Sequence, residues 1–151
     1  MKAREGNFTF QFETFGQIEN ALELIFSPSA ASAILYTTAI KCGVHLYQKT
    51  KKEFNKKEEA LNYLSSLKKE ENWGKMSFQE VNFKNGSGRV IIDDSFEAMA
   101  RKTNQPSCHF FRGFIAGFLS ELLKKTIIVT EEKCAGKGDK HCEFIFGEQQ
   151  A

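Results

Sequence analysis

The chain has 151 residues, of which 41% are hydrophobic and 26% are charged, and we expect residues 1–151 to form a single compact domain. Twenty-one basic and nineteen acidic side chains leave a net charge of +2, which is too balanced for a chain whose main task is direct binding of nucleic acid. No apolar run is long enough for a membrane span, and the start MKAREGNF lacks the apolar segment of a signal peptide, so we expect a soluble cytoplasmic protein.

The first predicted elements are an extended segment and a helix. Phe8, Phe10 and Phe12 alternate with polar residues, which is typical of a half-buried strand or extended segment. After Gly16, the apolar residues from Ile18 to Phe26 follow helical spacing.

A long second helix is predicted from Ser27 to about Lys52. Ser27 is a good N-cap, and Pro28 suits the first helical position. Cys42 and His45 fall on the apolar stripe of this helix, so we expect both in the core. The lysine-rich segment 49–57 also contains glutamate and is interpreted as a solvated helix end and turn.

Alternating segments indicate two hairpins separated by helices. A third helix over 60–67 ends at Asn72-Trp73-Gly74. Residues 76–83 and 90–92 flank Asn85-Gly86 and predict a β-hairpin. A short helix over 95–102 follows, then a long helix over 108–125, and a second hairpin from 126–130 and 142–146. The order predicts an α+β fold with helices packed on an antiparallel sheet built from two hairpins.

The long helix over 108–125 is predicted to be largely buried, because apolar residues cover most of its circumference. Gly113, Ala116, Gly117 and Ser120 form a stripe of small residues on it. Glycine weakens a helix, so this stripe indicates close approach of another helix or of a ligand.

Three cysteines in the last third carry the clearest chemistry. Cys134 and Cys142 flank a glycine-rich turn that can bring their thiols together. Glu131 or Glu132 can reach the same end of the hairpin. Cys108, at the start of the long helix, can supply a third thiolate, favoured by the helix dipole.

Three sulfurs and a carboxylate would make a closed tetrahedral set, as in structural zinc sites. The alternatives are a disulfide, which a reducing cytosol disfavours, and a catalytic thiol activated by His109 or His141. The residues alone leave these interpretations open.

The carboxy-terminal segment contains a recognisable motif: Phe111-Arg112-Gly113-Phe114, then Cys134, Gly138-Asp139, Cys142 and Phe144. It resembles the 4-vinyl-reductase domain family, a small-molecule-binding domain of archaeal and bacterial proteins. The family includes sensor domains of bacterial transcription activators that respond to phenols and other aromatics. Its fold is related to vesicle-tethering subunits of the TRAPP complex, and the order of predicted elements extends the resemblance over the chain.

The resemblance implies a specific metal site. The aromatic-sensing members bind structural zinc through Cys, Glu, Cys and Cys, in an order that fits Cys108, Glu131, Cys134 and Cys142. It favours Glu131 over Glu132 and implies a zinc hairpin region over 108–146. Family members commonly dimerise, so a homodimer is expected.

A ligand cavity is expected between the helices and the sheet. Phenylalanine is unusually frequent, at 15 residues against one tryptophan and three tyrosines, and suits a dry core or a dry ligand cavity. The candidate wall residues are Ile34, Leu35, Tyr36, Phe110, Phe114 and Phe118. The aromatic sensors hold a phenolic hydroxyl with a tryptophan and a histidine, but Trp73 lies at a predicted helix end and is not aligned with that pocket.

The expected function is therefore a zinc-stabilised binding or sensing domain for an apolar or aromatic small molecule, acting through an oligomer or partner. One alternative is a 4-vinyl reductase or a tetrapyrrole-binding accessory protein. The sequence has no G-x-G-x-x-G fingerprint and no iron–sulfur cysteine cluster, and no catalytic residue is assigned. The other alternative is a structural assembly subunit, by fold analogy.

Overall fold

A four-stranded antiparallel sheet and five α-helices make up the part of the chain described by the computed structural model, residues 6–9 and 11–150. The predicted α+β fold is confirmed. The helices are α1 (Phe12–Ile25), α2 (Pro28–Thr50), α3 (Lys57–Glu70), α4 (Phe96–Ala100) and α5 (His109–Leu123), with 3₁₀ turns η1 (Lys51–Glu53) and η2 (Ala135–Lys137). The strands are β1 (Lys75–Asn82), β2 (Ser87–Asp93), β3 (Ile127–Lys133) and β4 (Cys142–Glu148).

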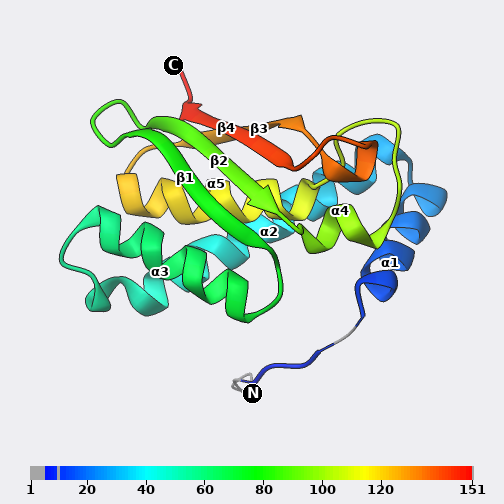
Figure 1. Cartoon of the computed structure of the whole chain (residues 1–151), viewed down its shortest axis with the longest axis horizontal. Helices are drawn as coiled ribbons and strands as arrows, with labels where there is room; N and C mark the ends of the chain where they lie inside the picture. Colours follow the sequence, from blue (N-terminus) through cyan, green and yellow to red (C-terminus); the bar gives the residue numbers. More distant parts are fainter. Residues whose placement is uncertain (1–5, 10, 151) are drawn as a thin grey trace.

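The sheet joins the two predicted hairpins in the order β1-β2-β4-β3. Figure 1 shows it along one side of the molecule, with α5 and α2 beneath it, α3 beside β1, and α1 with α4 at the opposite end. Alternate side chains, among them Val90, Val129 and Phe144, are fully buried on the helix side of the sheet. Period-two burial of β-branched and aromatic residues explains why these segments form strands.

Helices α2 and α5 cross with their backbones in contact. A Cβ built on Gly113 would lie 2.3 Å from the Tyr36 carbonyl oxygen, and one on Gly117 would lie 2.2 Å from that of Ile40. Gly43 of α2 packs equally closely on Phe114. The stripe of small residues on α5 therefore serves helix packing, which was one of its two predicted roles.

Two predictions for buried side chains on α2 are wrong. Cys42 and His45 are both exposed. The buried positions of α2 form a narrow row that includes Ala31, Leu35 and Ala39. Because α2 lies so close to α5, only this row is covered, and positions 42 and 45 lie outside it.

The prediction of an extended segment at the amino end is also wrong at Phe12, because this residue begins helix α1. Phe8 lies in a stretch without helix or strand, and Phe10 lies outside the described residues. Phe12 and Phe15 are one helical turn apart and both face the apolar core, so tertiary packing prevails over the local alternation.

Where the structure describes the chain, it contains no helix long and apolar enough to span a bilayer. The long helices α2 and α5 are instead accounted for by their packing on one another and on the sheet.

Candidate metal centre and aromatic cluster

The chain reversal between β3 and β4 brings two cysteines together. Gly138 has a φ of 113°, a conformation that glycine adopts without strain. The Cys134 N–H donates to Asp139 Oδ2 at 2.9 Å, and the Asp139 N–H donates to the Cys134 carbonyl at 3.2 Å. These reciprocal bonds fix the turn, so that Cys134 at the end of β3 faces Cys142 at the start of β4.

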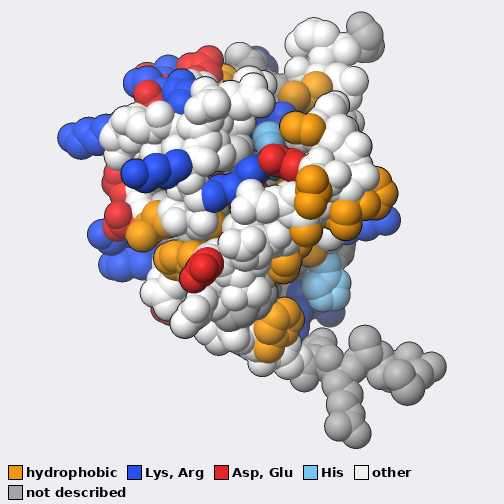
Figure 2. Space-filling model, turned by 90° about the vertical axis from the view of Figure 1, so that its right-hand side faces the viewer, with side chains coloured by type: hydrophobic (Ala, Val, Ile, Leu, Met, Phe, Trp, Pro, Cys, Tyr) orange, Lys and Arg blue, Asp and Glu red, His pale blue; other side chains and the backbone are white. Residues whose placement is uncertain are grey.

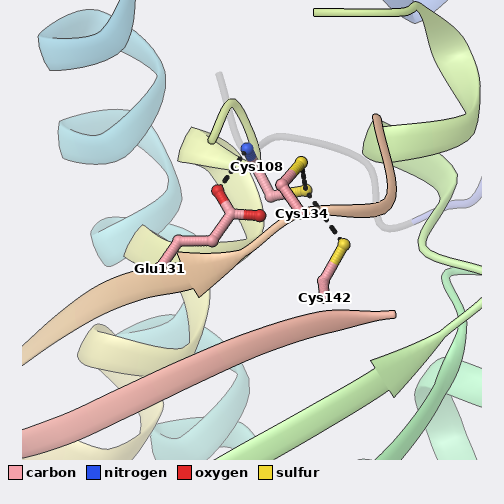
Figure 3. Close-up of side chains that lie close together, drawn as sticks. All are labelled: Cys108, Glu131, Cys134 and Cys142. Atoms are coloured by element: carbon pink, nitrogen blue, oxygen red, sulfur yellow. Dashed lines mark hydrogen bonds between the residues drawn. The ribbon is translucent and has the colours of Figure 1, made fainter. Parts of the chain in front are cut away.

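The third cysteine arrives from the helix layer. Cys108 is the residue before α5, and its sulfur lies 3.9 Å from that of Cys134 and 3.7 Å from that of Cys142. The three sulfurs converge with the Glu131 carboxylate, as Figure 3 shows. One donor atom from each of Cys108, Glu131, Cys134 and Cys142 lies within 4.8 Å of every other. We call these four residues the Cys₃Glu group.

Glu131 uses one carboxylate oxygen to hold the start of α5. Its Oε2 accepts the Cys108 N–H at 2.9 Å, whereas its Oε1 is buried without a hydrogen-bond partner. An unpaired buried carboxylate oxygen is costly. Because Oε1 stands beside three sulfurs, the arrangement has the donor set and the free oxygen that a bound metal ion requires.

Close contact among the four side chains shifts their pKa values in different directions. A hydrogen bond from the Cys108 thiol, and then one from Cys142, lowers the pKa of Cys134. The hydrogen bond to Cys134 raises the pKa of Cys108 well above its usual value. Burial, together with the Cys134 charge, raises the pKa of Glu131 to about 8. A cation at this point would lower the pKa of all four side chains, since it favours the ionised form of every ligand.

Further polar groups surround the sulfurs. Ser95 Oγ lies 3.6 Å from Cys108 Sγ, and Ser107 Oγ lies 3.9 Å from Cys134 Sγ. The Ala135 N–H donates to Cys142 Sγ at 3.3 Å. Such contacts would help to orient the sulfurs toward a bound metal ion.

The two other roles considered for the cysteines find no support. All four cysteines are free. His109 Nδ1 lies 3.1 Å from Ser32 Oγ, and His141 Nε2 lies 3.5 Å from the Glu143 carboxylate. His109 thus contacts a serine, and His141 Nε2, which has no hydrogen-bond partner, lies nearest a glutamate; neither contact is with the thiols for which the two histidines were considered as activating bases.

The six predicted wall residues lie in four different surroundings. Phe110 and Phe114 contact Trp73. Leu35 and Phe118 are buried in the core. Tyr36 stacks under the Arg112 guanidinium and lines a groove of about 520 Å³ beside β3, and Ile34 is exposed.

Six rings lie together beside the Cys₃Glu group, and sequence reasoning named only Phe110 and Phe114 among them as candidate wall residues. Trp73 contacts four phenylalanines with ring centroids 5.1 to 5.7 Å apart. Phe15 packs edge-on against Phe96 at 5.0 Å and Phe110 at 5.9 Å. We call this set the aromatic cluster: Phe15, Trp73, Phe96, Phe110, Phe111 and Phe114.

One buried cation borders the aromatic cluster. Lys68 Nζ lies 3.7 Å from the Trp73 ring centroid and 4.3 Å from that of Phe114. Its side chain is 5% exposed and pairs with Glu71 at 2.6 Å. Burial lowers the pKa of Lys68. The only sequence signal for this arrangement was Asn72-Trp73-Gly74 after a helix, which predicted a turn and gave no sign of ring contacts.

Comparisons with known sequences agree with the carboxy-terminal motif. Residues 89–148 match the model of the V4R domain family. The chain is 43% identical over 58 residues to an uncharacterized protein of Methanocaldococcus jannaschii and 35% identical over 57 residues to the phenol regulator MopR of Acinetobacter guillouiae. These matches cover 37% and 34% of this chain, but only 25% and 10% of the two relatives.

Comparisons with solved structures cover almost the whole chain. The phenol-responsive sensory domain of the transcription activator PoxR, solved with phenol, has a TM-score of 0.82 at 21% identity, over 94% of this chain and 76% of that one. A vinyl-4-reductase family protein from Methanocaldococcus jannaschii gives 0.70 at 19% identity, over 95% and 85%. A trafficking protein particle complex subunit 3 from Naegleria fowleri, covalently bound to palmitic acid, gives 0.65 at 14% identity, over 92% and 95%. At these identities the likeness establishes the fold.

Proposed function

The chain carries a V4R domain over residues 89–148, and we propose that it is a zinc-stabilised domain that binds or senses an apolar or aromatic small molecule. The observation that carries the proposal is the aromatic cluster beside the Cys₃Glu group, within a fold shared with a phenol-responsive sensory domain. We further propose that the whole of residues 1–151 is this one domain, and that it acts in the cytoplasm through a homodimer or partner.

The aromatic cluster supports an aromatic ligand through its composition. Two of its residues, Phe110 and Phe114, belong to the predicted cavity wall, and Trp73 supplies an indole N–H that can donate to a hydroxyl. Ligand sites of this kind are mostly apolar, with few polar groups. The ligand would enter among the rings from the half-buried Phe110 and Trp73.

A binding measurement with phenol tests the ligand proposal. We expect phenol to raise the melting temperature of the zinc-loaded wild type by a few degrees, and Phe110→Ala to remove most of this shift. Ile128→Ala, an exposed position on β3, is the matched control and should keep the shift. Absence of a shift with phenol, toluene and biphenyl in folded wild-type protein would contradict the proposal.

The sulfur spacing supports zinc as the metal. A tetrahedral site with Zn–S bonds of about 2.3 Å has edges of about 3.8 Å, and the observed sulfur separations are 3.7 and 3.9 Å. Three thiolates and Glu131 Oε1 would complete a closed set of four ligands. Zinc in such a site contributes folding free energy, and no substrate position remains open.

Metal analysis tests the zinc proposal independently of the ligand. We expect about one zinc per chain in the wild type. Cys134→Ser should lose it and unfold at least about 10 °C lower, equivalent to roughly 3 kcal/mol. Cys42→Ser, an exposed cysteine on α2, should retain both metal and stability. A stable wild type purified without metal, or equal metal in both variants, would overturn the proposal.

Exposed apolar side chains support the homodimer. Most of the exposed large hydrophobic residues belong to α1, to the residue that follows it, to α2 and to α4, and Figure 2 shows hydrophobic side chains on the end of the molecule that carries α1 and α4. We call this the end patch: Ile18, Leu24, Ile25, Phe26, Ile34 and Met99. Patches of this kind mark interaction sites, and a second copy of the chain would cover it.

A further inference from the structure

The groove beside β3 shares no lining residue with the aromatic cluster or with the Cys₃Glu group. It encloses about 520 Å³, and α2, α5 and the edge strand β3 form its walls. From Arg112 to Ser120, α5 rises about 12 Å along it, since each helical residue adds about 1.5 Å. We call it the β3 groove, lined chiefly by Tyr36, Ile40, Arg112, Ala116, Ser120 and residues 126–130.

The middle of the β3 groove is apolar and its two ends are polar. Gly117 packs on the Ile40 carbonyl, which places Ile40 beside Ala116, midway between Arg112 and Ser120. At the far end, Ser120 Oγ accepts the Ile127 N–H at 2.9 Å, so the Ser120 hydroxyl is already engaged. A molecule that fits the groove would therefore have an apolar body and place its polar group at the Arg112 end.

Arg112 brings an uncompensated positive charge to that end. The other two arginines in the described part of the chain, Arg89 and Arg101, both pair with glutamates. Among the described residues, no carboxylate lies within salt-bridge distance of Arg112. Its guanidinium Cζ lies 4.6 Å from the Tyr36 ring centroid, and its Nη2 donates to Ser32 Oγ at 3.5 Å. A guanidinium has several N–H donors, so most of those of Arg112 remain for an anion.

The guanidinium is positioned before any ligand binds. Arg112 is half-buried, and its contacts with Tyr36 and Ser32 restrict the rotation of a long side chain, so less entropy is lost on binding. A carboxylate matches the planar fork of a guanidinium with two parallel hydrogen bonds. Arg112 is the one charged residue that the described part of the chain contributes to the groove wall, which suits a ligand with a single negative charge.

The surroundings favour a free small molecule over a peptide strand or a linked acyl chain. The Ile127 N–H donates to α5 and not to β4, so the open edge of β3 is occupied where an added strand would need a donor. No cysteine is among the described residues that line the groove, so a thioester has no attachment point there.

We propose that the β3 groove is a second ligand site, which binds an aliphatic carboxylate without covalent attachment. The carboxylate pairs with Arg112, and the hydrocarbon chain lies along Ile40 and Ala116. The pairing neutralises a charge that the described part of the chain leaves unpaired, and burial of the chain removes apolar surface from water. This site does not depend on the binding of an aromatic molecule in the aromatic cluster.

Titration calorimetry of the full-length chain with octanoate tests the proposal. From butanoate to octanoate we expect the affinity to rise roughly fourfold per CH₂, since each buried CH₂ contributes about 0.8 kcal/mol. Arg112→Gln should weaken octanoate binding at least about tenfold, the scale of a hydrogen bond to a charged group. Lys102→Gln removes the same charge from an exposed side chain outside the groove and should bind as the wild type does. Octanol and octylamine should bind at least about tenfold more weakly than octanoate.

An NMR titration of the Arg112 Nε–H group locates the site in the wild type, without any variant. We expect this resonance to move and saturate with octanoate and to stay in place with phenol. Absence of octanoate binding, equal binding of octanol, or an unchanged affinity in Arg112→Gln would overturn the proposal. Arg112→Gln should keep any rise in melting temperature that phenol produces, so failure of the aromatic-ligand proposal and failure of this one give different results.

Discussion

At the residue scale, Glu131 divides its two oxygens between two tasks. Oε2 holds the Cys108 N–H at 2.9 Å, and Oε1 is left free beside the sulfurs. The same side chain thus positions one cysteine and completes the donor set. Glu132, the alternative that the sequence left open, is exposed and outside the Cys₃Glu group.

Replacing Glu131 separates these tasks. In Glu131→Gln the amide oxygen can still accept the Cys108 N–H, but the anionic ligand is lost. We expect the zinc affinity to fall roughly 10-fold to 100-fold, the scale seen when groups that support a metal site are removed. Competition with a chelating dye measures this, with Glu132→Gln as control. Equal affinities in the two variants would show that the carboxylate of Glu131 is not a ligand.

The metal affinity should also depend on pH. Each ligand must lose its proton before it binds a cation, and in the metal-free protein the pKa of Glu131 is raised to about 8, mainly by burial. Affinity should therefore fall by at least about tenfold per pH unit as the pH decreases from 8 to 6. Zinc titrations at fixed ionic strength would show this slope, and a pH-independent affinity in that range would contradict it.

At the element scale, the contact between α2 and α5 sets the spacing of the helix layer. Gly43, Gly113 and Gly117 allow backbone to meet backbone, and side chains of ordinary size would separate the two helices. Because α5 also carries Phe110, Phe111 and Phe114, its position fixes half of the aromatic cluster.

Adding one methyl group at this contact should be costly. In Gly117→Ala the new Cβ would stand 2.2 Å from the Ile40 carbonyl oxygen, so the helices must move apart. We expect a loss of about 1–3 kcal/mol in the free energy of unfolding, despite the better helix propensity of alanine. Urea denaturation measures the change. Gly147→Ala, where nothing lies within 4 Å of the added atom, should be nearly neutral, and equal stabilities would refute the argument.

Local signals in the sequence were sufficient to predict the type and approximate position of most helices and strands. Ser27 and Pro28 predict the start of α2, and the Ser27 hydroxyl does accept the Ala30 N–H at 3.1 Å. The exposure of Cys42 was not predictable, because the width of the contact between α2 and α5 depends on glycines of the partner helix. A helical stripe indicates which residues can be buried, and the neighbouring element decides how many are.

The candidate site was also predictable only where local geometry brings its residues together. Cys134 and Cys142 are eight positions apart around a turn, so local geometry brings them together. Trp73 reaches the aromatic cluster only because Asn72 and Gly74 take positive φ values of 59° and 145° and redirect the chain between α3 and β1.

At the scale of the whole molecule, apolar exposure is concentrated at one end. In the end patch, Leu24 is 87% exposed and Ile25 is 70% exposed. On β3, an edge strand of the sheet, Ile128 is the exposed large hydrophobic residue. This asymmetry favours association through the end that carries α1.

A charge in the end patch should therefore prevent self-association. We expect wild-type protein to sediment as a dimer, and Leu24→Glu with Phe26→Glu to sediment as a monomer with unchanged zinc content. Ile128→Glu is the matched control at an exposed position remote from α1. Analytical ultracentrifugation distinguishes these outcomes, and a dimer that survives the paired change would exclude the end patch as its interface.

The strand order also determines when during synthesis the molecule can be completed. Strand β2 pairs with β4, the last strand in the chain, and Cys142 is the last member of the Cys₃Glu group to be made. The first hairpin must therefore leave the ribosome with the β2 edge unpaired, a state prone to pairing with other chains. Closure of that edge and completion of the Cys₃Glu group both wait for the same seven-residue strand, so the nascent sheet stays open to aggregation until that strand has been made.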